Sequence, residues 1–136
     1  MALLPAVLDT DILSAIMRQT PTALPHARKY LTAHKRFTLS LITRYEVLRG
    51  LKVKKADKQL AAFDVFCSRC IILPLNEEAI NKASEIYANL SRRGLLIGDA
   101  DILIAASALV RGMKVVTNNE KHFSRINDLQ IENWLK

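Results

Sequence analysis

Short apolar runs alternate with longer amphipathic segments along the chain. The runs predict short strands at residues 6–8, 37–39, 71–73 and 115–117, with a final short strand at 129–131. Runs of three or more apolar residues without polar alternation are typical of strands that are covered on both faces. Because segments with helical spacing separate these runs, the pattern predicts an α/β fold with a mostly parallel central sheet.

The segments between the runs carry helix signals. Residues 12–17, 25–33 and 41–51 are predicted helices, and Ser40 is the expected N-cap of the third. In that third helix Leu41, Tyr45 and Leu48 form an apolar stripe that is expected to face the core. Residues 60–67 contain a further helical face, assigned to the core or to a dimer surface, and a long amphipathic helix is expected between Asn76 and Gly94.

The stretch at residues 97–108 places two carboxylates at the start of a helix that is otherwise almost wholly apolar. Gly98 is expected to break the incoming chain and Asp99 to cap the first turn. Asp101 then lies in the first turn, where the helix dipole favours negative charge. A helix that is apolar all round is a buried helix, and an unpaired charge at its end is costly. We therefore expect Asp101 to face a divalent metal ion.

Two further oxygen-bearing side chains follow predicted strands. Asp9 comes directly after the first strand and Asn119 shortly after the fourth. Ligands bind at the carboxyl edge of open α/β sheets, so Asp9, Asn119 and the start of the 99–110 helix are expected to meet there. Such a set of oxygen donors suits Mg²⁺ or Mn²⁺. Glu46 lies off the apolar stripe of its helix, and the pattern alone predicts that it faces solvent.

Length, charge and residue composition limit the number of domains, the kind of partner and the kinds of site that the chain can have. A chain of 136 residues suits one domain, residues 1–136, and the net charge of +7 from 20 basic and 13 acidic residues favours a polyanionic partner, nucleic acid first. No apolar run approaches a membrane span, so we expect a cytoplasmic protein. Cys67 and Cys70 lack the second ligand pair that a zinc site needs and are expected to be ordinary small apolar residues. The scattered histidines, His26, His34 and His122, are expected to be structural or on the surface.

Four short motifs in this order resemble the PIN-domain ribonucleases, and among them the toxins of VapBC toxin–antitoxin pairs. They are the residues at 8–11 (LDTD), 40–50 (SLITRYEVLRG), 98–106 (GDADILIAA) and 116–119 (VTNN) with Phe123. The resemblance extends nearly end to end and includes residues 131–134 (IENW). It implies a PIN-like three-layer α/β/α sandwich.

The resemblance also assigns roles to individual residues. Asp9, Glu46 and Asp101 match the three core acids of the family, which hold the metal ion, and Asn119 matches a fourth catalytic position that is Asp or Asn among relatives. The resemblance gives supporting roles to four polar residues that orient acids or water: Thr10, Ser40, Thr43 and Thr117. It leaves Asp99 as a cap or an accessory ligand. The family match thus reverses the solvent-facing expectation for Glu46.

The implied activity is metal-dependent hydrolysis of RNA phosphodiester bonds, leaving a 5′-phosphate and a 3′-hydroxyl. One or two Mg²⁺ or Mn²⁺ ions would activate a water and stabilise charge on the attacked phosphate. The basic residues available to hold the RNA backbone are Arg44, Arg49, Lys52, Lys54, Arg92 and Arg93. The family also implies a homodimer, a cognate VapB-type antitoxin that blocks the site, and inhibition of translation through an RNA target such as tRNA or rRNA.

Two alternatives remain open at this stage. A receiver-like signalling domain also gathers acids at the carboxyl edge of a parallel sheet, but it needs a phospho-accepting Asp after a central strand and a Lys after a late strand. Here Asn118 and Asn119 follow the late strand, and Asp101 begins a helix. The second alternative is a PIN fold that binds RNA or a partner without cutting, and the complete set of acids argues against it.

Overall fold

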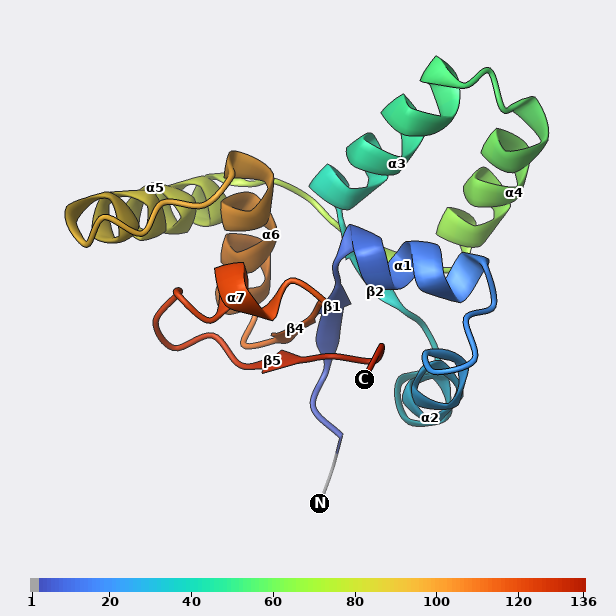
Figure 1. Cartoon of the computed structure of the whole chain (residues 1–136), viewed down its shortest axis with the longest axis horizontal. Helices are drawn as coiled ribbons and strands as arrows, with labels where there is room; N and C mark the ends of the chain where they lie inside the picture. The colour runs from blue at the N-terminus through green and yellow to red at the C-terminus, as the bar shows by residue number, and fades with distance from the viewer. Residues whose placement is uncertain (1–2) are drawn as a thin grey trace.

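A parallel sheet of five short strands forms the centre of the molecule. The computed structural model describes residues 3–136, and in it the strands follow the order β3-β2-β1-β4-β5 with every neighbouring pair parallel (Figure 1). The strands are β1 (Ala6–Leu8), β2 (Thr38–Ser40), β3 (Ile71–Leu73), β4 (Lys114–Val116) and β5 (Ile131–Glu132). The parallel sheet predicted from the apolar runs is therefore confirmed: β1 and β3 have the predicted bounds, and those of β2, β4 and β5 shift by one or two residues.

Seven helices connect and cover these strands in the described part of the chain. They are α1 (Thr10–Met17), α2 (Leu24–His34), α3 (Leu41–Val53), α4 (Asp57–Ser68), α5 (Glu77–Arg92), α6 (Asp99–Leu109) and α7 (Glu120–Phe123). Figure 1 shows α1 to α4 on one side of the sheet and α5 to α7 on the other. This is the α/β/α arrangement that the family resemblance implied.

The central strand explains why the core has two halves. Side chains alternate between the faces of a strand, so Ala6 and Leu8 pack into one apolar cluster while Val7 packs into the other. The first cluster includes Phe63 of α4 and the C-terminal Trp134. The second is built on α5 and on α6, whose residues from Ile104 to Ala108 are all buried. The buried helix predicted from its composition is thus confirmed.

The stripe predicted for α3 faces the core only in part, because Leu48 packs against the first core cluster but Leu41 and Tyr45 do not. Leu41 is 44% exposed and Tyr45 is 57% exposed, and Thr43 is the one fully buried residue recorded for this helix. The reason is visible in Figure 1, where α3 and α4 form a hairpin that projects beyond the sheet, so that only part of α3 has a partner. α3 extends two residues beyond the predicted end at residue 51 and so includes Lys52.

The described helices do not include a membrane span. Within residues 3–136, none combines the length and the apolar character needed to cross a bilayer.

Candidate active site

Asp9 is fixed at the carboxyl edge between the two central strands. β1 and β4 are parallel with Leu8 opposite Val116, so the residues that follow them, Asp9 and Thr117, are neighbours. The backbone N–H of Asp9 donates to the carbonyl of Val116 over 2.9 Å. Its Oδ2 accepts a 2.7 Å hydrogen bond from Thr117 Oγ1, and its Oδ1 accepts the N–H of Thr10 at the start of α1. Asp9 and Thr117 are both buried, which gives this carboxylate a single defined position.

Burial makes the charged form of Asp9 costly. Desolvation is the main cause that raises the pKa of Asp9 to about 7, and the negative charges of Asp11 and Asp101 add to it. The hydrogen bonds from Thr117 and from the backbone of Thr10 act in the opposite direction but do not cancel the effect. A carboxylate that served only as a helix cap would be stabilised in its ionised form. Asp9 instead has a strong need for a positive charge close by.

Asp11 is a second carboxylate at this edge that the sequence analysis did not select. Its Oδ1 accepts the N–H of Ile12, and its Oδ2 accepts the N–H of Asn118 over 3.0 Å, which ties α1 to the chain after β4. Burial, followed by the charge of Asp101, raises the pKa of Asp11. The signal available in the sequence was the spacing of two residues between Asp9 and Asp11 within the motif at residues 8–11.

Glu46 reaches the same edge from α3. Its Oε1 accepts a 2.8 Å hydrogen bond from Thr10 Oγ1, and its Oε2 lies 3.7 Å from Arg49 one turn further along the helix. The side chain is 22% exposed, so the solvent-facing prediction from the helix pattern was wrong. Thr10 thus links Glu46 to the helix that Asp9 caps, in agreement with the supporting role implied by the resemblance.

Asp101 lies with Asn119 and His122. The Nδ2 atom of Asn119 is 3.5 Å from Asp101 Oδ2 and 2.9 Å from His122 Nδ1. His122 Nδ1 is itself 3.4 Å from Asp101 Oδ2. The structure therefore brings the start of α6 and the segment after β4 together, as predicted for Asp101 and Asn119. It also adds His122, which the sequence analysis had assigned to a structural or surface role.

The remaining supporting residues divide into three outcomes. Ser40 is the N-cap of α3, as predicted, and accepts the N–H of Ile42. Thr43 is fully buried, and its hydroxyl has no hydrogen-bond partner within residues 3–136. Gly98, rather than Asp99, is the N-cap of α6, so the capping expectation for Asp99 was wrong. Asp99 is the exposed first residue of the helix and lines a groove with Ile80 and Tyr87.

The predicted RNA-contacting residues differ in whether their side chains already contact other residues of the chain. Arg44 donates to Asp64 over 3.0 Å and lies over the ring of Phe63, and Arg93 donates to Asn89 and to the carbonyl of Arg125. Arg49 lies over the ring of Tyr45, on the side of α3 that carries Glu46. Lys52 and Lys54 are exposed at the far end of the hairpin.

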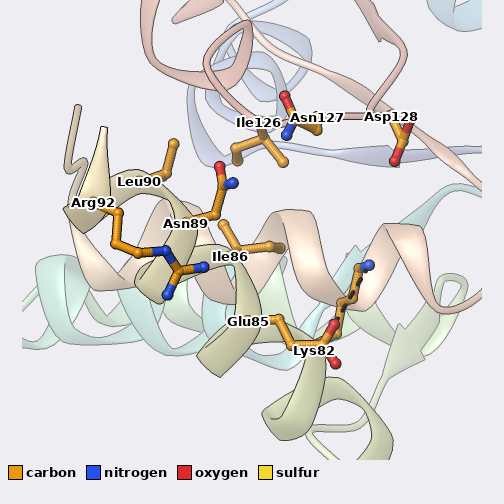
Figure 2. A pocket seen from close by; sticks show the side chains of 9 residues that line it. All are labelled: Lys82, Glu85, Ile86, Asn89, Leu90, Arg92, Ile126, Asn127 and Asp128. Carbon is orange, nitrogen blue, oxygen red and sulfur yellow. Dashed lines mark ion pairs between the residues drawn. The ribbon is translucent and has the colours of Figure 1, made fainter. Parts of the chain in front are cut away.

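Arg92 lines a hollow away from the acids. Figure 2 shows this hollow between α5 and the loop before β5, with Asn127 and Asp128 across from the helix. An ion pair of 3.7 Å between Lys82 and Glu85 runs along its wall. Its lining includes none of Asp9, Glu46, Asp101 and Asn119, so the hollow is separate from the acidic edge.

The donor set at the acidic edge fits a hard divalent cation in its chemistry. Carboxylate and amide oxygens are the ligands that Mg²⁺ and Mn²⁺ take, and a cation would favour the charged forms of Asp9 and Asp11, whose pKa values are raised mainly by burial and further by neighbouring carboxylates. The arrangement is not a ready-made cage, because within residues 3–136 no three His, Cys, Asp or Glu side chains are gathered tightly enough to hold an ion. Metal-binding proteins of this kind leave several positions to water and substrate phosphate, so one or two carboxylates are sufficient.

Comparison with known proteins agrees with this geometry. The family model described as "PIN domain" matches residues 6–129. The chain is 32% identical over 131 residues to "Ribonuclease VapC2" of Rickettsia felis, covering 96% of this chain and 98% of the relative. It is 33% identical over 130 residues to "tRNA(fMet)-specific endonuclease VapC" of Salmonella typhimurium, covering 94% and 96%.

Solved structures give the same result. The VapBC2 complex of Rickettsia felis bound to a promoter DNA fragment contains a chain that matches with a TM-score of 0.85 at 30% identity, covering 96% of this chain and 99% of that one. A chain of VapBC-1 from nontypeable Haemophilus influenzae matches with a TM-score of 0.86 at 28% identity, covering 98% and 100%. The family match, the full-length relatives and the acidic edge between β1 and β4 place this chain in the PIN-domain family, among the VapC-type ribonucleases.

Proposed function

We propose that this protein is a metal-dependent endoribonuclease and the toxin of a toxin–antitoxin pair. Asp9, Glu46 and Asp101 hold one or two Mg²⁺ or Mn²⁺ ions, and Asn119 completes the site. The observation that carries the proposal is the buried carboxylate of Asp9, whose pKa is raised to about 7 by burial and by two neighbouring carboxylates. A cation bound there turns an unfavourable cluster of charge into a favourable one.

The chemistry divides between the ion and the chain. When bound, the ion lowers the pKa of a water and stabilises negative charge on the phosphate under attack. Thr117 holds Asp9 in place, and Thr10 does the same for Glu46. Hydrogen bonds of this kind orient ligands and commonly change metal affinity or activity by ~10–100-fold.

Exposed basic residues near α3 supply the contacts to RNA. Arg49 is next to the site, and Lys52 and Lys54 extend the positive surface along the hairpin. Contacts to phosphate position an RNA without reading its sequence, so these residues contribute affinity rather than choice of target. Because two kinds of relative are named ribonuclease and tRNA(fMet)-specific endonuclease, tRNA is the first substrate to test, followed by rRNA.

The matched structures support a proposal of which proteins this chain binds. The matched structures are VapBC complexes, so we propose a VapB-type antitoxin that covers the acidic edge and a cytoplasmic setting in which both proteins meet RNA. We also propose a homodimer. Its contact surface is formed by the exposed apolar side chains of Ile80 and Tyr87 on α5, beside Leu103 of α6. Light scattering of the isolated chain tests that part of the proposal.

RNA cleavage with defined ions tests the proposed function. Purified protein is incubated with tRNA and rRNA in Mg²⁺, in Mn²⁺ or in chelator, and the ends of the products are determined. We expect ion-dependent cleavage that leaves 5′-phosphates and that the cognate antitoxin suppresses. Equal cleavage by the wild type and Asp101→Asn would remove the catalytic assignment. RNA binding without cleavage by either would favour a non-catalytic PIN domain.

A further inference from the structure

His122 provides a nitrogen atom at a site otherwise made of oxygen donors. It lies on α7, the short helix after β4, and its Nδ1 atom is 3.4 Å from Asp101 Oδ2. The side chain is 40% exposed, and that of Asp101 is 23% exposed. The neighbouring Phe123 is fully buried and supplies the packing of this segment, so His122 is not needed as a core residue.

The hydrogen bonds define which ring nitrogen carries a lone pair toward the site. The Nδ2 group of Asn119 can only donate, and it lies 2.9 Å from His122 Nδ1 and 3.5 Å from Asp101 Oδ2. With the Asn119 amide in this orientation, His122 Nδ1 acts as the acceptor, and in this tautomer the ring proton is on Nε2. The opposite orientation of the Asn119 amide would place its oxygen beside a carboxylate oxygen, where the two would repel each other.

The lone pairs of Asp101 Oδ2 and His122 Nδ1 thus both face the Nδ2 group of Asn119, which carries a partial positive charge. An ion with ligands at about 2.0–2.2 Å in octahedral geometry has neighbouring ligands about 3 Å apart. The separation of 3.4 Å between Asp101 Oδ2 and His122 Nδ1 is close to this value. The amide nitrogen of Asn119 lies beside both atoms, so the pair that would hold the ion already faces one polar group of the site.

We propose that His122 Nδ1 is a further ligand of the divalent ion held by Asp101, and that this nitrogen makes the site prefer Mn²⁺ over Mg²⁺. The inference rests on the proposed function, because it concerns the ion of that same site. Mg²⁺ is bound through oxygen ligands, whereas Mn²⁺, which suits the same carboxylates, is a transition-metal ion that also accepts an imidazole nitrogen. A site built from Asp9, Glu46 and Asp101 alone would not have this bias.

Electron paramagnetic resonance of bound Mn²⁺ tests the proposal without using cleavage. Coupling to a ¹⁴N nucleus is expected in the wild type and should be lost in His122→Gln. The matched control is His34→Gln, because His34 lies on α2, where its Nε2 atom contacts the carbonyl of Leu3. This control should keep the ¹⁴N coupling, and circular dichroism should show that both variants are folded.

Binding titrations supply the second measurement. Mn²⁺ affinity should fall by roughly 10–100-fold in His122→Gln, whereas Mg²⁺ affinity should change by no more than a few-fold. A wild-type Mn²⁺ spectrum without ¹⁴N coupling would overturn the inference without any variant. An unchanged ratio of Mn²⁺ to Mg²⁺ affinity in His122→Gln would do the same.

Failure of this inference can be told apart from failure of the proposed function. If the wild type binds both ions, and Asp101→Asn binds neither, but no nitrogen coupling appears, only the role of His122 is wrong. If the wild type binds neither ion, both the proposed function and the role of His122 are wrong.

Discussion

The acidic edge between β1 and β4 and the projecting α3–α4 hairpin use polar residues in opposite ways. At the edge, the carboxylate of Asp9 is buried, bonded to Thr117 and destabilised by neighbouring charge of the same sign. On the hairpin, apart from Glu46, which belongs to the edge, the charged groups are exposed, as at Lys52 and Lys54, or paired locally, as Arg44 is with Asp64.

This difference in burial and pairing distinguishes residues that take part in the reaction from residues that only bind RNA. Groups whose pKa is shifted by burial and a neighbouring charge are typical of functional sites. In such sites the surroundings favour the protonation state, or the bound ligand, that the group needs for its task. Exposed lysines contact phosphates through solvated ion pairs that salt weakens and that need no fixed geometry. We therefore expect changes at the edge to affect the reaction and changes on the hairpin to affect affinity for RNA.

The largest effect is expected for Asp101→Asn at the edge. Loss of this carboxylate should lower the rate of RNA cleavage by at least about 100-fold, because the ion loses a ligand and the attacked phosphate loses its charge stabilisation. Single-turnover cleavage at saturating protein measures the effect. Asp99→Asn is the matched control on the same helix, and its rate should stay within a few-fold of the wild type because Asp99 is exposed and lines the groove with Ile80 and Tyr87. Similar losses in both variants would point to a general effect of charge at the start of α6.

The stability of the ion-free protein should fall as the pH rises. The pKa of Asp9 is about 7 in the folded chain and near 3.8 in an unfolded one, so the folded state binds more protons between these values. The contribution of this group to the free energy of unfolding is therefore greatest below about pH 4 and is lost as the pH rises toward 7. Asp9→Asn removes the titration, so its free energy of unfolding relative to wild type should rise by roughly 2–4 kcal/mol from pH 4 to pH 8.

Urea unfolding in chelator at the two pH values checks this prediction. The exposed Asp128→Asn is the control, and its difference from wild type should not change with pH in this way. A constant difference between Asp9→Asn and wild type across this range would show that Asp9 is an ordinary carboxylate.

A smaller effect is expected for Thr10→Val, which removes the hydrogen bond to Glu46 and keeps the shape of the side chain. Activity should fall by ~10-fold because Glu46 is no longer oriented. Thr32→Val is the control, since Thr32 donates to a carbonyl of its own helix, α2, on the exposed surface. If Thr10→Val cleaves RNA at the wild-type rate, Glu46 either acts without this hydrogen bond or is not a ligand.

The smallest effect is expected on the hairpin. The double variant Lys52→Gln with Lys54→Gln should weaken RNA binding a few-fold for every RNA sequence, and it should reduce the slope of log affinity against log salt by about 0.7 for each lost phosphate contact. The cleavage rate at saturating RNA should not change. The control is the double variant Lys29→Gln with Lys35→Gln, on and beside α2. It has the same net charge as the hairpin variant. Equal losses in the two double variants would mean that only the total charge of the protein matters.

The two regions also differ in how far the sequence predicts them. The proximity of Asp9 and Thr117 follows from two apolar runs and from the rule that parallel strands end at the same edge. The buried helix α6 follows from its composition. The apolar spacing in α3 led to a wrong expectation for Leu41 and Tyr45, because spacing shows which residues share a face but not whether another element covers that face.

Side chains that depend on the return path of the chain were the hardest to place. Glu46 was expected in solvent on its pattern, and only the family motif indicated its role. His122 reaches Asp101 because the segment after β4 turns into α7, a helix of four residues too short to leave a periodic signal. Its one local sign was the spacing of three residues from Asn119, which places the two side chains on neighbouring positions of a helical turn.

Proton release on binding of Mn²⁺ tests the central claim most directly. Calorimetric titrations at pH 7 in two buffers with different ionisation enthalpies count the protons that leave the protein when the ion binds. Because the pKa of Asp9 is about 7, we predict binding with release of roughly half a proton from this group at pH 7, and no such contribution in Asp9→Asn. Absence of binding, or binding with the same proton release in wild type and Asp9→Asn, would contradict the assignment of this buried carboxylate as the centre of the metal site.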